Sequence, residues 1–347
     1  MRPPTPLPDE LDGRTFSRTQ ARALGVPDNR LRARDIERRS RGIYTHHPER
    51  QPQRRRRAPE PASTRQLRGA NPPEGLDMEL LRAVCDRSEV LWLSHQIAAQ
   101  FYSLPLPSRF AGAQRLHVSG LTRHLAIDAD VDVVHHWPRL VEGEVLDLQG
   151  IRVSSPERVF VDLMASLTLD ELVVLGDSLV RRPRPEFEGR DAPWSTIPRL
   201  KETLMAHRGA RGIVAAREAL TLVRVGADSP PETKLRLALI AAGLPEPELQ
   251  ILRDPEDPHS SSGDIGYRAA RIVLQYEGEH HFSVEQQHTD QNRDAEFRAD
   301  GWTVLLTNKV DLAEGFRGVV GHVRTLLKST TNASGVTGTR LDRVEYP

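Results

Sequence analysis

The last third of the chain alternates between helical and strand periodicity in an order that a mixed α/β fold satisfies. It opens at Ser229-Pro-Pro-Glu232 with an apolar helical pattern that closes at Gly243. The segments that follow have, in turn, strand, strand, strand, helix, strand and helix character: 247–254, 263–267, 271–282, 291–301, 302–308 and 314–328. The order αβββαβα predicts an α/β (α+β) domain over residues 229–327, with a central mixed sheet flanked by helices.

The strand over 271–282 carries polar side chains on a face that is otherwise apolar. Successive side chains of a strand point to opposite faces, so Val273, Gln275 and Glu277 share one face. Burying Gln and Glu there costs free energy unless both have partners. The neighbouring strand supplies Asp264, and Glu232 on the opening helix can add a further oxygen. Oxygen ligands of this kind suit Mg²⁺ or Mn²⁺, which can activate water against a phosphodiester.

Six short motifs occur in one order within this segment: Ser-Pro-Pro-Glu, Gly-Leu-Pro-Glu-Pro, Gly-Asp-Ile, Val-Leu-Gln-Tyr-Glu-Gly-Glu-His-His, Asp-Gln-Asn-Arg-Asp and Gly-Trp-Thr-Val-Leu. With these motifs the segment resembles the very-short-patch-repair-like endonucleases of the PD-(D/E)xK superfamily. The resemblance implies a restriction-endonuclease-like mixed sheet and metal-dependent hydrolysis of DNA, with Mg²⁺ or Mn²⁺ as the cofactor.

The resemblance also implies roles for individual residues. Asp264 matches the metal-binding aspartate of the superfamily, and Glu232 matches the helix glutamate. His281 matches a histidine that follows the core strand. Asp290 and Arg293 match a polar pair that precedes the Gly-Trp strand. Glu232 or His281 is therefore expected to assist proton transfer.

The central strand departs from the family pattern. Gln275 stands where the family usually has an acid, and Glu277 stands where it usually has an aspartate. No lysine occupies the last position of the motif. A neutral amide oxygen is a weaker ligand for a hard cation than a carboxylate, so Glu277 or Glu279 has to compensate. The expected metal ligands are Asp264 and Glu277, with Gln275 in a supporting position.

Each of these residues also has a purely structural interpretation. Glu232 lies three residues after a serine, which is the capping-box spacing, and it can cap the helix and act in catalysis at once. Asp264 can be a turn residue. Gln275 and Glu277 can lie on a solvent-facing side of the strand, and His281 can be a surface histidine.

Residues 1–45 have the pattern of a winged helix-turn-helix segment. A short helix capped by Ser17 ends in a glycine turn, and Asp28 can cap a second helix over 28–39. Residues 40–46 then have strand character behind a tight glycine turn and would form the wing. The arginines placed on or beside the second helix, and expected to contact phosphates or guanine edges of DNA, are Arg30, Arg32, Arg34, Arg38 and Arg39. The alternative is a small helical cap with a solvated arginine face.

Charge is distributed unevenly along a chain whose formal net charge is zero. Residues 1–70 hold 17 arginines and 8 acidic residues, a balance of +9, so the remainder carries −9. A basic arm of this kind favours an anionic partner, and nucleic acid is the commonest one. Residues 46–75, with Arg54 to Arg57 in one run, are too polar to fold alone and are interpreted as a disordered basic linker. Residues 328–347 are interpreted as a disordered tail.

The segment over 76–223 alternates between helices and strands and predicts a mixed α/β middle domain without a phosphate-binding glycine loop or a nucleophile motif. The phrases GIY, LSHQIAAQFYSLPLP and SSPERVFVDL resemble AbiE-type antitoxins, in which a winged-helix segment precedes an α/β domain. The single Cys85 excludes internal disulfides and multi-cysteine zinc sites. No apolar run long enough to span a membrane is present, so we expect a cytoplasmic protein.

Three functions are compatible with these patterns. The leading one is a metal-dependent DNA endonuclease whose basic N-terminal segment delivers DNA. The second is a non-catalytic DNA-binding transcriptional regulator, or antitoxin-like factor with a toxin-like protein partner, that retains a degenerate nuclease domain. The third is a partner-binding protein in which the middle domain matters most.

Overall fold

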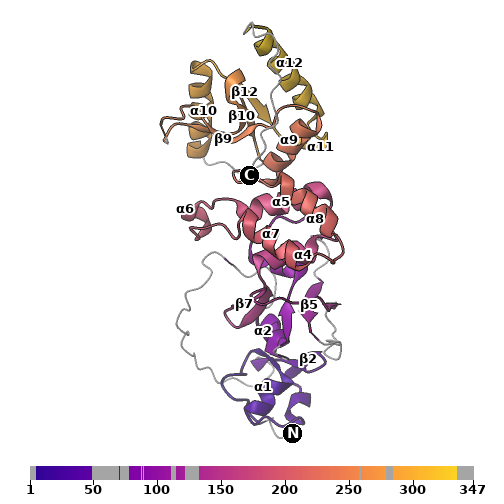
Figure 1. Cartoon of the computed structure of the whole chain (residues 1–347). Coiled ribbons are helices and arrows are strands. Elements are labelled where there is room, and N and C mark those ends of the chain that lie inside the picture. Colours follow the sequence, from indigo (N-terminus) through magenta and orange to yellow (C-terminus); the bar gives the residue numbers. More distant parts are fainter. Residues whose placement is uncertain are drawn as a thin grey trace. The chain divides into compact units, whose positions relative to one another are not determined.

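A computed structural model describes residues 5–48, 70, 78–86, 88, 90–110, 115–121, 133–257, 259–278 and 284–333. The chain divides into two compact units, Met1–Val223 and Arg224–Pro347. The expected mixed α/β content is confirmed, with three sheets that are antiparallel or mixed (Figure 1). Within the described residues no helix is both long and apolar enough to cross a membrane. The expected linker and the end of the expected tail lie almost wholly outside these residues.

The N-terminal part of the first unit is a small antiparallel sheet with one helix. Its elements are β1 (Thr15–Ser17), α1 (Arg18–Ala23), β2 (Ile36–Ser40) and β3 (Ile43–His46), and the strand order is β1-β3-β2. Ser17 and Gln20 form a capping box at the start of α1, so the first expected helix is confirmed. The expected strand behind the Gly42 turn is also confirmed, since Gly42 has φ +82° and connects β2 to β3.

The prediction of a second helix over 28–39 is wrong. In its place stand a single 3₁₀ turn at Arg30–Arg32 and strand β2. The carboxylate of Asp28 does not cap a helix, because it accepts hydrogen bonds from the guanidinium groups of Arg18 and Arg22. Arg30 instead makes a bidentate, buried ion pair with Asp35, which fixes the turn before β2. The arginine spacing suggested a helix face, but this buried ion pair, which His46 joins through Asp35 at 3.1 Å, overrides the local propensity.

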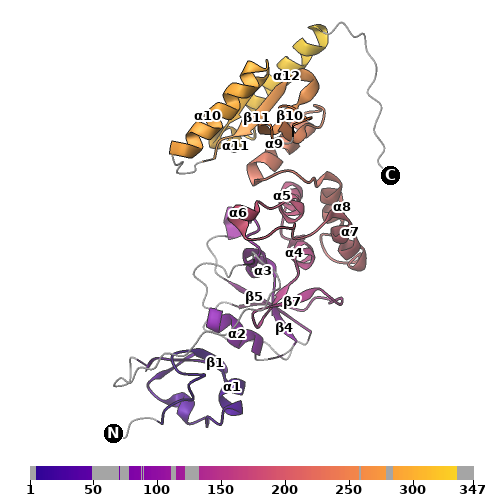
Figure 2. The same cartoon turned by 90° about the vertical axis from the view of Figure 1, so that its left-hand side faces the viewer.

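The rest of the first unit is built on a five-stranded mixed sheet with the order β6-β5-β4-β8-β7. Its strands are β4 (Leu91–Leu93), β5 (Leu116–Gly120), β6 (Val133–His136), β7 (Val145–Leu148) and β8 (Ile151–Ser154). Its helices are α2 (Met78–Asp86), α3 (His95–Phe101), α4 (Pro156–Leu163), α5 (Leu169–Val180), α6 (Pro185–Glu188), α7 (Ile197–Ala206) and α8 (Ile213–Leu222). Figure 2 shows α4, α5, α7 and α8 gathered into one group.

Local signals place α4 and α8 in this unit. Ser155 accepts a hydrogen bond from the Arg158 backbone, and Pro156 occupies the first helical position, as the sequence predicts. Gly212 caps α8 with φ +87°, and a Cβ there would lie 2.6 Å from the backbone oxygen of Met164. Glycine at this position therefore lets the start of α8 approach the end of α4.

The second unit has the expected order of elements. They are α9 (Pro230–Ala241), β9 (Glu248–Leu252), β10 (Ser262–Tyr267), β11 (Ile272–Tyr276), α10 (Val284–Ala299), β12 (Thr303–Thr307), α11 (Lys309–Ala313) and α12 (Arg317–Ala333). The sheet order is β12-β11-β10-β9, with β9, β10 and β11 antiparallel and β12 parallel to β11. The short helix α11 escaped the sequence analysis, and α12 continues beyond the expected end at residue 327.

The two faces of this sheet are covered by different helices. Ile272 and Leu274 of β11 pack with Leu239 of α9 and Val323 of α12 in one buried cluster. Val273 packs on the other face with Ile251, Phe297 of α10 and Trp302. The strict alternation along β11 therefore confirms the strand periodicity. Figure 1 shows α10 on the opposite side of the sheet from α9 and α12.

We predict that Arg30→Met destabilises the N-terminal sheet by about 3 kcal/mol, because it removes the bidentate guanidinium partner of the buried Asp35 carboxylate. Hydrogen exchange of the β2 and β3 amides measures the effect. The control is Arg32→Met, which removes an exposed guanidinium from the same turn and should change stability by less than about 0.5 kcal/mol. Equal exchange rates in the two variants would contradict a structural role for Arg30.

Candidate functional site

Glu232 is held rigidly at the first turn of α9. Its side chain is 6% exposed, Oε1 accepts a hydrogen bond of 2.7 Å from the Ser229 hydroxyl, and Oε2 accepts one of 2.8 Å from the Asp228 backbone N–H. Ser229 caps α9, but the Glu232 carboxylate accepts from the N–H of Asp228 and not from that of Ser229, so the capping box is met only in part. The same hydrogen bonds hold the buried carboxyl group of Glu232 in one orientation. Its contacts at the start of the helix are therefore compatible with a role in catalysis.

Asp264 lies at an irregularity of β10 instead of on a regular strand face. Strands β9 and β10 pair from Ser262 with Leu252 to Gly266 with Glu248, but the backbone is irregular opposite Asp264, where Gln250 has φ +48°. The Asp264 carboxylate accepts a hydrogen bond of 2.8 Å from the Tyr276 backbone N–H. A side-chain oxygen therefore occupies the place of a ladder carbonyl, and Asp264 is directed toward the end of β11.

The carboxyl groups of Glu232 and Asp264 interact, although 32 positions separate them along the chain. Burial raises the pKa of Glu232 from 4.5 to about 8, and the negative charge of Asp264 is the second cause. Helix α9 and strand β10 thus bring two acidic groups together in a partly dry environment. Of the residues expected in the carboxylate site, Glu232 and Asp264 are therefore two that the structure brings close enough to interact.

Gln275 is buried on the α10 face of the sheet. Its Nε2 donates a hydrogen bond of 2.8 Å to Oδ1 of Asp294, and its Oε1 has no hydrogen-bond partner. Asp294, on α10, is 8% exposed and also lies 3.5 Å from Arg298. The interpretation of Gln275 as a solvent-facing residue is wrong. The motif resemblance pointed to Asp290 and Arg293 on this helix, and not to Asp294, one position beyond Arg293.

The remaining expected residues lie farther from this pair or outside the described structure. Glu277 is exposed just past β11, where its backbone N–H donates to Thr307 O over 2.7 Å. Arg293 is half-buried on α10. His281 and the side chain of Asp290 fall outside the described residues. Among the residues that are described, Glu232, Asp264 and Glu277 do not form a converging group of three potential metal ligands.

The N-terminal arginines divide into two kinds. Arg30 is buried in its ion pair with Asp35, so its expected contact with DNA is wrong for this structure. Arg39 is half-buried and lies 3.6 Å from Glu37. Of the five arginines expected to contact DNA, Arg32, Arg34 and Arg38 are exposed.

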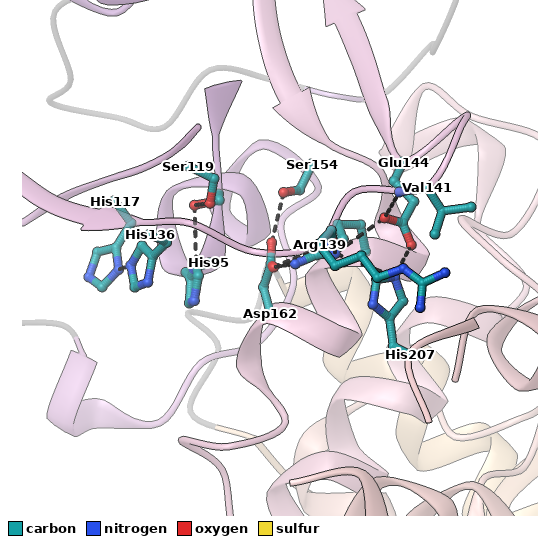
Figure 3. Close-up of polar contacts among 12 residues, drawn as sticks. His95, His117, Ser119, His136, Arg139, Val141, Glu144, Ser154, Asp162 and His207 are labelled. Atoms are coloured by element: carbon teal, nitrogen blue, oxygen red, sulfur yellow. Dashed lines mark hydrogen bonds and ion pairs between the residues drawn. The ribbon is translucent and has the colours of Figure 1, made fainter. Parts of the chain in front are cut away.

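The first unit holds a buried polar network that the sequence analysis missed. Arg158 of α4 lies 2.7 Å from Asp162 and 3.2 Å from Glu144. Glu144 in turn contacts His207 at 2.5 Å (Figure 3). Asp162 also accepts a hydrogen bond of 2.7 Å from Ser154. The signal available in the sequence was the Arg158/Asp162 spacing of one helical turn.

A cavity of about 510 Å³ opens beside this network. Arg158, Asp162 and His207 line one part of it, and His95 and His136 line another. Burial is the main cause that lowers the pKa of both His95, to about 2, and His136, so both imidazoles are neutral at neutral pH. The cavity therefore offers neutral imidazole nitrogens next to the buried network around Arg158.

We predict that Asp264→Asn stabilises the second unit at alkaline pH. Because the pKa of Glu232 is raised in the folded state, its contribution to stability falls as pH rises from about 4.5 to about 8. Removing the Asp264 charge lowers that pKa and should recover about 1 kcal/mol at pH 8.5, with little change at pH 4. Asparagine keeps the acceptor for the Tyr276 N–H.

The measurement is hydrogen exchange of the β10 and β11 amides at both pH values. Asp300→Asn, which changes an exposed aspartate of the same unit, serves as the control. A loss of stability at pH 8.5 in Asp264→Asn would show that the two carboxyl groups do not repel each other.

Comparison with known proteins gives two relatives. Two uncharacterised proteins of Mycobacterium tuberculosis, from strains CDC 1551 and H37Rv, are each 34% identical to the chain over 107 residues. The matched stretch covers 30% of this chain and 40% of each relative, so the chain spans less than half of their length. No protein-family model matches the chain, and no solved structure matches it significantly. The similarity leaves function to be argued from the residues themselves.

Proposed function

We propose that the protein is a metal-dependent endonuclease whose second unit hydrolyses DNA phosphodiester bonds. The observation that carries the proposal is the interaction of the buried Glu232 of α9 with the half-buried Asp264 of β10, beside a four-stranded mixed sheet. The motifs of this segment resemble very-short-patch-repair-like endonucleases, and the αβββαβα order agrees with the restriction-endonuclease-like fold that the resemblance implies.

The residues at this position fit a hard divalent cation. Asp264 and Glu232 offer carboxylate oxygens, and Gln275 offers an Oε1 that is buried without a hydrogen-bond partner. An orphaned buried oxygen costs free energy that a bound cation would recover. Asp264 and Gln275 would hold Mg²⁺ or Mn²⁺, with Glu277 reaching in from the end of β11. The cation would supply positive charge that activates water and neutralises the transition state.

The protein's own groups would manage protons and position the DNA. Glu232, with a pKa of about 8, exchanges a proton in the range where DNA cleavage is normally measured, so it suits a general acid–base role. Ser229 and the Asp228 backbone hold its carboxyl group in one orientation. His281 is the alternative proton carrier that the sequence suggests.

The N-terminal segment would deliver DNA through its exposed arginines and the β2–β3 hairpin, which takes the place of a wing. Arg32, Arg34 and Arg38 present exposed guanidinium groups, while Arg30 has a structural role. Contacts with phosphates by such groups position a protein on DNA without reading its sequence.

We predict metal-dependent nicking of supercoiled or mismatch-containing DNA with Mg²⁺ or Mn²⁺. Asp264→Asn should abolish cleavage, and Glu232→Gln should slow it by at least about 100-fold, because an amide cannot exchange the proton. Asp300→Asn should cleave like the wild type. Cleavage that survives unchanged in Asp264→Asn would remove the second unit as its source.

A second variant tests the effect of having glutamine at position 275, where the resembled family usually has an acid. The double substitution Gln275→Glu with Asp294→Asn reverses the polarity of a buried hydrogen bond while preserving its shape. It places a carboxylate where the resembled family usually has one, and should tighten Mg²⁺ binding by about tenfold or more. Asp294→Asn alone is the matched control, because it changes the helix partner without adding a carboxylate to the strand.

A second candidate, a DNA-binding regulator or antitoxin-like factor with a degenerate nuclease domain, is favoured by two observations. The Gln275 amide is engaged by Asp294, and the Glu277 side chain is exposed. This candidate predicts no cleavage by the wild type, together with salt-sensitive DNA binding that weakens in an Arg32/Arg34/Arg38→Ala variant. Loss of three phosphate contacts would lower the salt slope by up to about 2.7. Cleavage by the Gln275→Glu/Asp294→Asn variant, with none by the wild type, would also support this candidate. A toxin-like protein partner would then be expected.

A further inference from the structure

Three histidines of the first unit converge from elements that are separate in the sequence. His95 begins α3 directly after β4, His117 lies on β5, and His136 ends β6. Strand β5 pairs in parallel with β6 and antiparallel with β4, so the sheet itself brings the three residues together. One nitrogen of each ring lies within 4.8 Å of the others. Among the residues that the structure describes, these three histidines form the one converging group of potential metal ligands.

The rings form a close group. The ring centroids of His95 and His136 are 3.6 Å apart, those of His117 and His136 are 5.1 Å apart, and those of His95 and His117 are 5.4 Å apart (Figure 3). His117 Nδ1 and His136 Nε2 lie 2.9 Å apart. Two nitrogens on one tetrahedral zinc are separated by roughly 3.3 Å. The rings of His95 and His136 are stacked with an interplanar angle of 19°, so coordination requires at least one ring to rotate and bring its nitrogen around a common point.

His95 is prepared for this role by its neighbours. Ser119 Oγ donates a hydrogen bond of 2.8 Å to Ser94 Oγ, which lies 3.0 Å from Nδ1 of His95. A proton on Nδ1 would donate to Ser94 and leave the Nε2 lone pair for a metal, as the outer hydrogen bonds of metal-binding histidines do. His95 also has φ +53°, a left-handed conformation that is sparsely populated for a residue other than glycine.

We propose that His95, His117 and His136 form a binding site for a divalent transition metal such as Zn²⁺, with one coordination position open to the adjacent cavity. Three imidazole nitrogens match the preference of zinc and neighbouring metals, whereas Mg²⁺ prefers oxygen. His95 and His136 line the 510 Å³ cavity, which leaves room for water or a small ligand as the fourth donor. This site lies in the first unit and is independent of the proposed carboxylate site in the second.

The experiment measures Zn²⁺ binding to the full chain by competition with a chromophoric chelator, and Co²⁺ binding by its visible absorption. The wild type should bind one ion at the histidines, with the Co²⁺ spectrum of a nitrogen-rich, low-coordinate site. His95→Asn and His136→Asn should each lose affinity by at least about 100-fold. Asparagine tolerates the left-handed backbone of position 95, so the first variant keeps the local fold.

The matched control is His135→Asn, which changes the neighbouring histidine on β6, whose side chain points to the opposite face of the strand. It should bind Zn²⁺ like the wild type, and so should Asp264→Asn, which separates this site from the carboxylate site. The absence of stoichiometric Zn²⁺ and Co²⁺ binding by the wild type would overturn the proposal and leave a packed histidine stack. Equal affinity in His95→Asn and His135→Asn would overturn it as well.

Discussion

The buried guanidinium group of Arg158 joins the sheet and the helices of the first unit. It binds Asp162 one turn further along α4 and Glu144 in the loop before β7, and both carboxylates are buried with it. Asp162 reaches Ser154 at the end of β8, and Glu144 reaches His207 just after α7. Removing one member of such a network leaves an uncompensated charge in the interior. The network therefore fixes where α4 and the end of α7 meet the sheet, and with them one wall of the cavity.

The second unit is organised by apolar packing instead. Its sheet is covered on both faces, and the polar groups of the candidate site lie where that packing stops, near the end of β11. Glu232 is tied to the first turn of its helix and Asp264 to the backbone of the neighbouring strand. Both side chains are thus positioned by main-chain groups, which move little when surface residues change.

Periodicity and capping signals predicted most of the fold because they are local. The Ser229-Pro-Pro-Glu232 start of α9, the alternation along β11 and the Ser155 cap of α4 all depend on residues close in sequence. The failures have other causes. The second N-terminal helix was lost to the buried ion pair between Arg30 and Asp35, which also contacts His46 of β3, and the strands β4 and β7 are too short to show a clear period.

The candidate sites divide in the same way. The motifs pointed to Glu232 and Asp264 as site residues. No sequence pattern predicted the hydrogen bond between Gln275 and Asp294, which lie 19 positions apart. The three clustered histidines lie on β5, on β6 and directly after β4, so their approach depends on strand pairing. Such pairing is a property of the whole sheet, and a single sequence contains no local signal for it.

The buried hydrogen bond between Gln275 and Asp294 also limits the order in which these two positions can change during evolution. A glutamate that arises first at position 275 faces the aspartate directly, and two carboxylates in a dry site repel each other. An asparagine that arises first at position 294 leaves two amides, which can still hydrogen-bond. Moving the carboxylate from position 294 on the helix to position 275 on the strand is therefore tolerated in one order. Asp294 has to change to asparagine before Gln275 changes to glutamate.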